Sequence, residues 1–168
     1  MTFILTAVCV EPGRALGTRY GRLLLRPVPT DGEAPFRAGF ATTLGRYLPV
    51  PVDGSAYYIV TDEGAGYETS NVFASYPTGE DDPVRLAIPP ELHEAFESCV
   101  SDLLAASSAG RVVLIFEFNG NVTAPEESPG QALSVDVVGP MPVSDFWWRL
   151  ELGELVEDSI IQLELART

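Results

Sequence analysis

The single histidine of the chain, His93, opens the one stretch of sequence that approaches a metal-binding motif. His93 and Glu94 are followed by Glu97, so the stretch differs from the zinc-binding pattern His-Glu-x-x-His by a glutamate in place of the second histidine. Zinc sites built on two or three histidines cannot form in one chain with one imidazole. The alternative is a surface helix position at which His93 pairs with Glu97 one turn later. We expect no bound metal.

Two cysteines, Cys9 and Cys99, could act as nucleophiles or form one disulfide. Cys9 lies in the apolar run 3–10, and Cys99 falls on the apolar face of the predicted main helix. We therefore expect both to be buried, reduced thiols of a cytoplasmic protein. Six residues along a helix separate Cys99 from His93 by about 9 Å of rise. That spacing excludes a Cys–His pair between them, whereas a pair between Cys9 and His93 stays open.

Paired carboxylates are the remaining route to hydrolytic chemistry. Glu117 stands inside a strongly apolar segment, and Asp136 lies in another predicted strand. If the two strands are neighbours, one carboxyl group could serve as a general acid and the other as a base. The chain has no lysine, so it has no phosphate-binding Gly-x-x-x-x-Gly-Lys loop and no Schiff-base chemistry. It also lacks a Gly-x-Ser-x-Gly nucleophile turn. We expect no catalytic residue and no cofactor.

Charge is distributed unevenly along the 168 residues, whose formal net charge is −14. Six arginines accompany three carboxylates in residues 1–46, a net charge of +3, which leaves −17 for residues 47–168. A field of this sign repels the phosphates of nucleic acids and attracts cationic proteins. The alternative reading is a solvated acidic surface that keeps the protein dispersed.

Acidic clusters in the second region are interleaved with tyrosine and tryptophan. Trp147 and Trp148 are adjacent, so they cannot both point into a core. Carboxylates and exposed rings on one face would make a surface that attracts and anchors a basic protein. The residues assigned to this partner-binding surface are Tyr76, Glu80, Asp81, Asp82, Trp148, Glu151, Glu154, Glu157 and Asp158.

Hydrophobic periodicity predicts the elements that must position these residues. Residues 3–10 are almost continuously apolar, which is typical of a strand covered on both faces. No Lys or Arg precedes them, and eight residues are short for a secretion signal. Residues 91–106, opened by two prolines, carry one apolar stripe and predict the main helix, with Asp102 facing away from the core. Residues 111–118 predict a central strand.

The other segments give shorter elements. A hairpin is predicted between 56–61 and 67–76, and Asn119-Gly120 is a typical hairpin turn. Gly139-Pro140 is expected to end a strand. Ser144-Asp145 is expected to cap a short helix over 146–152, which we prefer to an alternating strand there. The remaining elements are strands at 22–28, 84–88, 133–138 and 160–165, a helix at 36–48 and a loop at 11–21.

These elements predict an α+β fold. We expect one domain over residues 1–168, with a mainly antiparallel sheet of six to eight short strands. One long helix, at about 91–106, and one or two short helices would pack on it. No apolar run is long enough to span a membrane.

Small, acidic, lysine-poor domains without catalytic residues resemble, in composition, the immunity proteins that protect bacteria from their own toxins. The resemblance covers no motif, so no residue role is taken from it. It implies a non-enzymatic cytoplasmic inhibitor that occupies the functional surface of a basic toxin, with a nuclease as the natural cationic target. A small carboxylate-dependent hydrolase and a structural or adaptor domain of a larger assembly are the alternatives. The oligomeric state is open.

Overall fold

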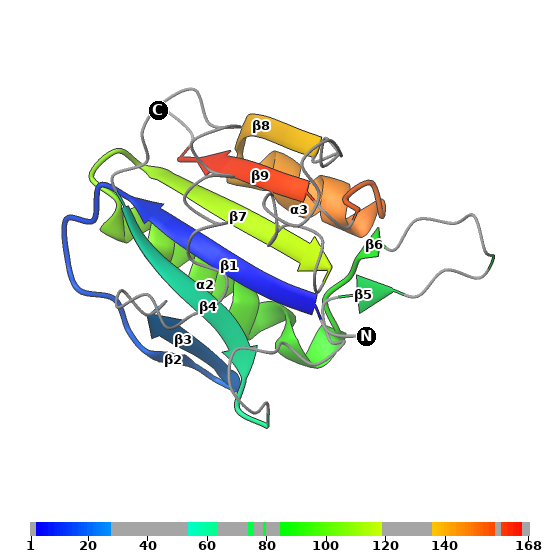
Figure 1. The fold of residues 1–168 in the computed structure, drawn as a ribbon, viewed down its shortest axis with the longest axis horizontal. Helices are drawn as coiled ribbons and strands as arrows, with labels where there is room; N and C mark the ends of the chain where they lie inside the picture. Colours follow the sequence, from blue (N-terminus) through cyan, green and yellow to red (C-terminus); the bar gives the residue numbers. More distant parts are fainter. Residues whose placement is uncertain are drawn as a thin grey trace, which may run out of the picture.

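A computed structural model describes residues 3–27, 54–63, 74–75, 79, 85–118, 136–156 and 159–165. These residues form a seven-stranded mixed sheet whose one face is covered by two helices, as Figure 1 shows. The α+β class and the mainly antiparallel sheet predicted from the sequence are confirmed. Neither described helix is long and apolar enough to cross a lipid bilayer.

Strand order in the large sheet is β2-β3-β4-β1-β7-β9-β8. Every neighbouring pair is antiparallel except β8 and β9, which run parallel. The strands are β1 (Phe3–Val10), β2 (Arg19–Tyr20), β3 (Leu23–Pro27), β4 (Gly54–Thr61), β7 (Arg111–Phe118), β8 (Asp136–Pro142) and β9 (Ser159–Glu164). A separate two-stranded sheet pairs β5 (Ala74–Ser75) with β6 (Arg85–Leu86).

Strand β1 lies at the middle of the sheet because its sequence suits burial on both faces. Leu5, Ala7 and Cys9 join the core under the helices, while Val8 and Val10 join a second cluster on the opposite face. All five are buried. Successive side chains of a strand point to opposite faces of the sheet. Consecutive buried residues therefore mean that both faces of the sheet are covered at β1. The predicted two-sided burial of β1 is confirmed.

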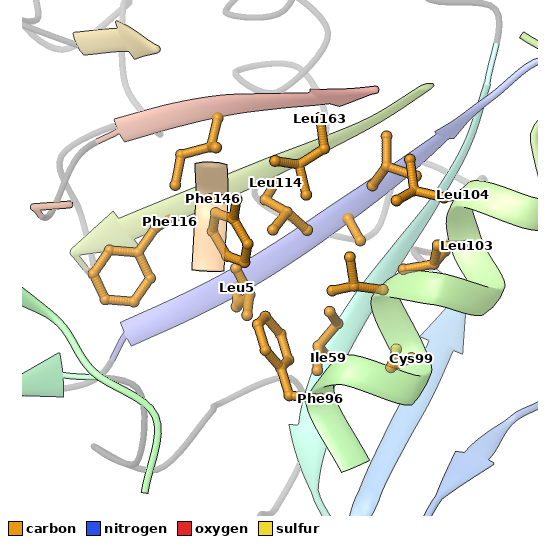
Figure 2. Packing of buried hydrophobic residues seen from close by; sticks show 14 of the residues in the cluster. Leu5, Ile59, Phe96, Cys99, Leu103, Leu104, Leu114, Phe116, Phe146 and Leu163 are labelled. Atoms are coloured by element: carbon orange, nitrogen blue, oxygen red, sulfur yellow. The ribbon is translucent and has the colours of Figure 1, made fainter. Parts of the chain in front are cut away.

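Helix α2 (Pro90–Ala106) covers the sheet with the apolar stripe predicted from its sequence. Proline is suited to the first turn, because N–H groups there have no intrahelical acceptor and proline has no N–H to leave unpaired. Glu91 lies near the positive end of the helix dipole. Figure 2 shows Phe96, Cys99 and Leu103 of the helix pointing at Ile59 and Leu5 of the sheet. Burying a side chain of this size stabilises the fold by about 1.5–3 kcal/mol.

Helix α3 (Val143–Glu151) covers the same face next to β8 and β9. The prediction of a helix rather than a strand is confirmed, but the helix begins earlier than expected. Pro142 is its N-cap, and no side chain caps it, so the predicted Ser144-Asp145 cap is wrong. Gly153 ends the helix as a left-handed residue with φ +67°, and its N–H donates to the Leu150 carbonyl.

One predicted strand pairing and one predicted loop are wrong. β4 pairs with β1 on one edge and with β3 on the other, so the described part of 67–76 does not form a hairpin with it. Ala74–Ser75 pairs with β6 instead. The loop predicted at 11–21 also contains β2. β4 pairs instead with β1 and β3, which contribute the buried residues Ala7, Leu23 and Leu25, so long-range pairing overrode the local turn signal.

Strand β8 runs through Gly139-Pro140 instead of ending there. A register shift between Val138 and Met141 absorbs the interruption, and pairing with β9 resumes at Met141. Gly139 has φ +100°, and a Cβ at this position would lie 2.5 Å from the carbonyl oxygen of Gln162. Glycine is therefore required for the close approach of β8 to β9. The helix predicted at 36–48 and the turn predicted at Asn119-Gly120 lie outside the described residues.

We predict that Gly139→Ala lowers the free energy of unfolding by about 1–3 kcal/mol, since it adds both a clash and a disfavoured φ. Urea denaturation followed by circular dichroism measures the change. Gly13→Ala is the control, because a Cβ there would meet its nearest neighbour at an ordinary 3.5 Å. Its effect should stay within about 0.5 kcal/mol. Equal losses in the two variants would contradict the assigned role of Gly139.

Candidate functional site

An aromatic cluster joins α3 to α2 and sets the rotation of α3 about its axis. The Trp147 ring packs against Phe96 of α2, with centroids 5.8 Å apart and planes at 87°, and against Phe146 at 4.9 Å. The His93 ring of α2 lies 5.5 Å from that of Trp147. Edge-to-face contacts of this kind add stability beyond the area they bury. Trp147 is therefore committed to the joint between the helices.

Trp148 points outward as a direct consequence. Successive residues of an α-helix differ by about 100° in direction, so the neighbour of an inward Trp147 faces solvent. Trp148 is 60% exposed, and Leu152, one turn later, is 50% exposed. Large apolar side chains exposed together are unusual on a protein surface and mark interaction sites more often than isolated ones do. The sequence argument that the two tryptophans cannot both point inward is confirmed.

The end of α3 is fixed in place by β6. Arg85 donates from Nη1 to the Gly153 carbonyl at 2.9 Å, and the Leu86 N–H donates to the Leu155 carbonyl at 2.8 Å. Leu155 is itself buried. These contacts anchor the backbone that follows Leu152. Trp148 and Leu152 are thus presented on a helix held at its inner face and at its C-terminal end.

Exposed carboxylates surround the two apolar residues. Asp145, Glu151 and Glu154 are all exposed, and Arg149 is the only Lys or Arg within α2 and α3. We call the set Asp145, Trp148, Glu151, Leu152 and Glu154 the α3 surface. It combines an apolar pair with negative charge on consecutive turns.

Arginines of the N-terminal region pair with acids in another part of the molecule. They neutralise carboxylates at the end of β4 and in the last turns of α2. Within the described part of the chain, no ion pair includes a carboxylate of the α3 surface. The pairs are Arg14 with Asp102, Arg19 with Asp62 at 2.9 Å, and Arg22 with Asp62 at 3.6 Å and with Glu63 at 2.6 Å.

The predicted partner-binding residues divide into two groups. Trp148, Glu151 and Glu154 lie together on α3 and the turn after it. Asp145 and Leu152 belong to the same surface but were not predicted; the helical spacing i, i+3 and i+7, which joins Asp145 to Trp148 and Leu152, was the signal that could have found them. The predicted residues Tyr76, Glu80, Asp81, Asp82, Glu157 and Asp158 lie outside the described residues.

Comparison with known proteins gives no assignment. The chain has no match to a protein-family model, to a curated protein sequence or to a solved structure.

The strands of the paired-carboxylate hypothesis are not neighbours. Glu117 belongs to β7 and Asp136 to β8, and β9 lies between them in the sheet. Two inter-strand steps separate the backbones of β7 and β8 by about 10 Å. The expectation that these carboxylates stand on adjacent strands is wrong.

His93 has a structural role that the sequence did not indicate. Its ring contacts Trp147, whereas the expected pairing with Glu97 does not occur. Among the residues that the structure describes, no group of three or more His, Cys, Asp or Glu side chains is arranged to hold a metal ion.

Asp102 anchors the segment after β1 to α2 and does not face away as predicted. The Tyr20 hydroxyl donates to its Oδ2 and the Arg14 guanidinium donates to its Oδ1. Hydrogen bonds from Tyr20 and Arg14 hold the pKa of the Asp102 carboxyl below its ordinary value. The pKa of Tyr20 is raised mainly by desolvation and, to a smaller extent, by the hydrogen bond to Asp102. Asp102, Tyr20 and Arg14 thus form a hydrogen-bonded joint between α2 and the segment that runs from β1 to β2.

Both cysteines are free, buried thiols, as the sequence predicted. Cys9 donates from Sγ to the Leu103 carbonyl at 3.5 Å. Burial raises the pKa of Cys9 and raises that of Cys99 to about 12. A thiol in such surroundings is a poor nucleophile, because the thiolate is the reactive form.

We predict that Asp102→Asn destabilises the fold by about 1–2 kcal/mol at neutral pH, through weaker hydrogen bonds to Tyr20 and Arg14. Because the pKa of Asp102 is lower in the folded state, its ionised form stabilises the fold at pH values above the unfolded-state pKa of about 4. This stabilisation is lost as the pH falls through the folded-state pKa. Urea denaturation of both proteins between about pH 7 and pH 3 should show the difference shrinking toward acid. A difference independent of pH would argue against an ionised Asp102 in this joint. Asp145→Asn, on the exposed helix α3, is the control for loss of one carboxylate.

We predict that neither cysteine reacts with an aromatic disulfide reagent in the native protein at pH 8, whereas both react in urea. Burial and raised pKa values suppress the thiolate in the folded state. The absorbance of the released thiol counts the reactive groups. Rapid release of even one equivalent from the folded chain would contradict the assigned environment.

Proposed function

We propose that the protein is an acidic, non-enzymatic inhibitor, an immunity protein that binds a cationic bacterial toxin and occupies its functional surface. The observation that carries the proposal is the α3 surface, on which Trp148 and Leu152 are exposed among carboxylates. Aromatic anchors surrounded by charge are the features that supply affinity and steering in protein interfaces.

Charge separation within the molecule supports this proposal. Arg14, Arg19 and Arg22 are engaged with Asp102, Asp62 and Glu63, so these three arginines do not neutralise the carboxylates near Trp148. An approaching basic protein would meet a negative field at the surface that also carries the apolar anchors. Electrostatic steering of this kind raises association rates by one to three orders of magnitude at low salt.

The class of the partner follows from the same chemistry. A toxin that cleaves nucleic acid must attract phosphates, so its active surface is cationic and would suit an acidic inhibitor. In this proposal the chain acts as one domain in the cytoplasm, where the two unbridged cysteines would stay reduced. The inhibitor blocks its partner and performs no chemistry.

We predict that a basic toxin encoded beside this protein forms a tight one-to-one complex with it. Affinity capture on the full chain, mass spectrometry and then titration calorimetry with the purified partner measure this. The association rate should fall steeply with added salt, because the steering charges are screened. Trp148→Ala should weaken binding about 30-fold or more, as expected for a central aromatic anchor.

Val137→Ala is the matched control, because Val137 is a 38% exposed apolar residue on β8, outside the α3 surface. It should change the affinity less than about twofold. An acidic partner, a salt-independent association rate or an unchanged affinity of Trp148→Ala would each contradict the proposal. Turnover of a small substrate by the purified chain would favour the hydrolase alternative, and binding of several unrelated proteins would favour the adaptor.

A further inference from the structure

The indole of Trp148 is an exposed ring with one acidic residue a turn before it and another a turn after it on the same helix. Asp145 precedes it by three residues and Glu151 follows it by three. Residues at this spacing are neighbours on a helix surface, with Cβ atoms about 5–6 Å apart. Both carboxylates are exposed, and neither forms an ion pair with a described residue. The ring therefore has a negative group on each side along the helix axis.

No ring or charged group of the described chain occupies the indole face. The ring contacts of this region belong to Trp147, on the inner side of α3. Arg149, the one Lys or Arg of the helix, follows Asp145 by four residues, but the structure shows no ion pair between the two. A cation from another molecule would thus meet an uncovered π face with two carboxylates beside it.

The chemistry of this arrangement selects among possible occupants. An aliphatic side chain would cover the ring but would desolvate the carboxylates without giving them a partner. A lysine ammonium is a compact, strongly hydrated charge. A guanidinium is flat, stacks on indole and still directs its N–H donors sideways, where Asp145 and Glu151 can accept them.

We infer that Trp148, Asp145 and Glu151 form a receptor for an arginine side chain of the partner. This inference rests on the proposed function and adds the identity of the group that the α3 surface binds. The guanidinium stacks on the indole of Trp148, and its edges donate hydrogen bonds to the two carboxylates. The joint between α2 and α3 fixes the helix that carries the three residues, so their backbone needs no ordering on association.

The test uses the full chain and a short oligo-arginine amide as the probe, with an oligo-citrulline amide of equal length as its neutral isostere. The indole N–H NMR signal of Trp148, assigned with Trp148→Phe, reports binding. We expect a saturable shift with oligo-arginine and none with oligo-citrulline. Oligo-lysine should bind more weakly than oligo-arginine. Equal shifts with the arginine and lysine peptides, or a shift with citrulline, would overturn the inference.

A series of increasingly fluorinated tryptophans at position 148 tests the π contribution. Fluorine withdraws electron density from the ring with little change in its size. Binding of oligo-arginine should weaken progressively, by about two- to fivefold in total. Affinity that does not change along the series would show that the ring acts only as an apolar surface, and the inference would fail.

A matched pair of double variants tests the carboxylates. Asp145→Asn with Glu151→Gln removes the flanking charges, and Glu94→Gln with Glu97→Gln removes the same charge from α2. We expect the first pair to weaken oligo-arginine binding at least threefold more than the second. Equal effects would indicate general attraction by an acidic protein. Thermal unfolding of each variant confirms that the fold is retained.

The outcome is separable from that of the proposed function. If calorimetry yields a one-to-one complex with a basic toxin but the fluorinated series is flat, the function stands and the arginine receptor is wrong. If oligo-arginine binds Trp148 as expected but no basic partner forms a complex, the receptor stands and the inhibitor assignment is wrong.

Discussion

The packing of Trp147 between the helices is the constraint on which the surface of this protein depends. Its contacts with Phe96 and Phe146 partly bury one tryptophan of an adjacent pair and leave the other exposed. The rotation of α3 then decides which carboxylates stand beside Trp148. The aromatic contacts of Trp147 stabilise this packing by about 1 kcal/mol beyond the area they bury. They thereby determine which side chains α3 exposes to solvent.

Charge is organised on the same scaffold. The loop after β1 brings Arg14 to Asp102, while Arg19 and Arg22 meet the carboxylates at the end of β4. Exposed ion pairs of this kind add little to stability. Each of these pairs neutralises a carboxylate that lies outside the α3 surface. Among the described residues, these arginines thus leave the carboxylates of the α3 surface without an ion pair.

Local patterns predicted the parts of this fold that depend on local physics. The stripe of α2, the two-sided burial of β1 and the helical state of α3 follow from period and composition. The partners of β4, the passage of β8 through Gly139 and the bonds of Asp102 depend on residues far away in the sequence. No periodicity carries that information. For the candidate site, residue type and charge alone were enough to propose Trp148, Glu151 and Glu154, whereas Asp145 and Leu152 could be added only once the helix was placed.

Strand β8 forms one border of the large sheet, and two of its residues, Pro140 and Pro142, have no backbone N–H to offer. The opposite border, β2, is only two residues long. Neither border is a good template for the strand of another molecule, since extending a sheet needs a continuous row of donors and acceptors. A partner of the kind proposed above would then be met by exposed side chains of the helical layer, such as Trp148 and Leu152, rather than by a described edge of the sheet.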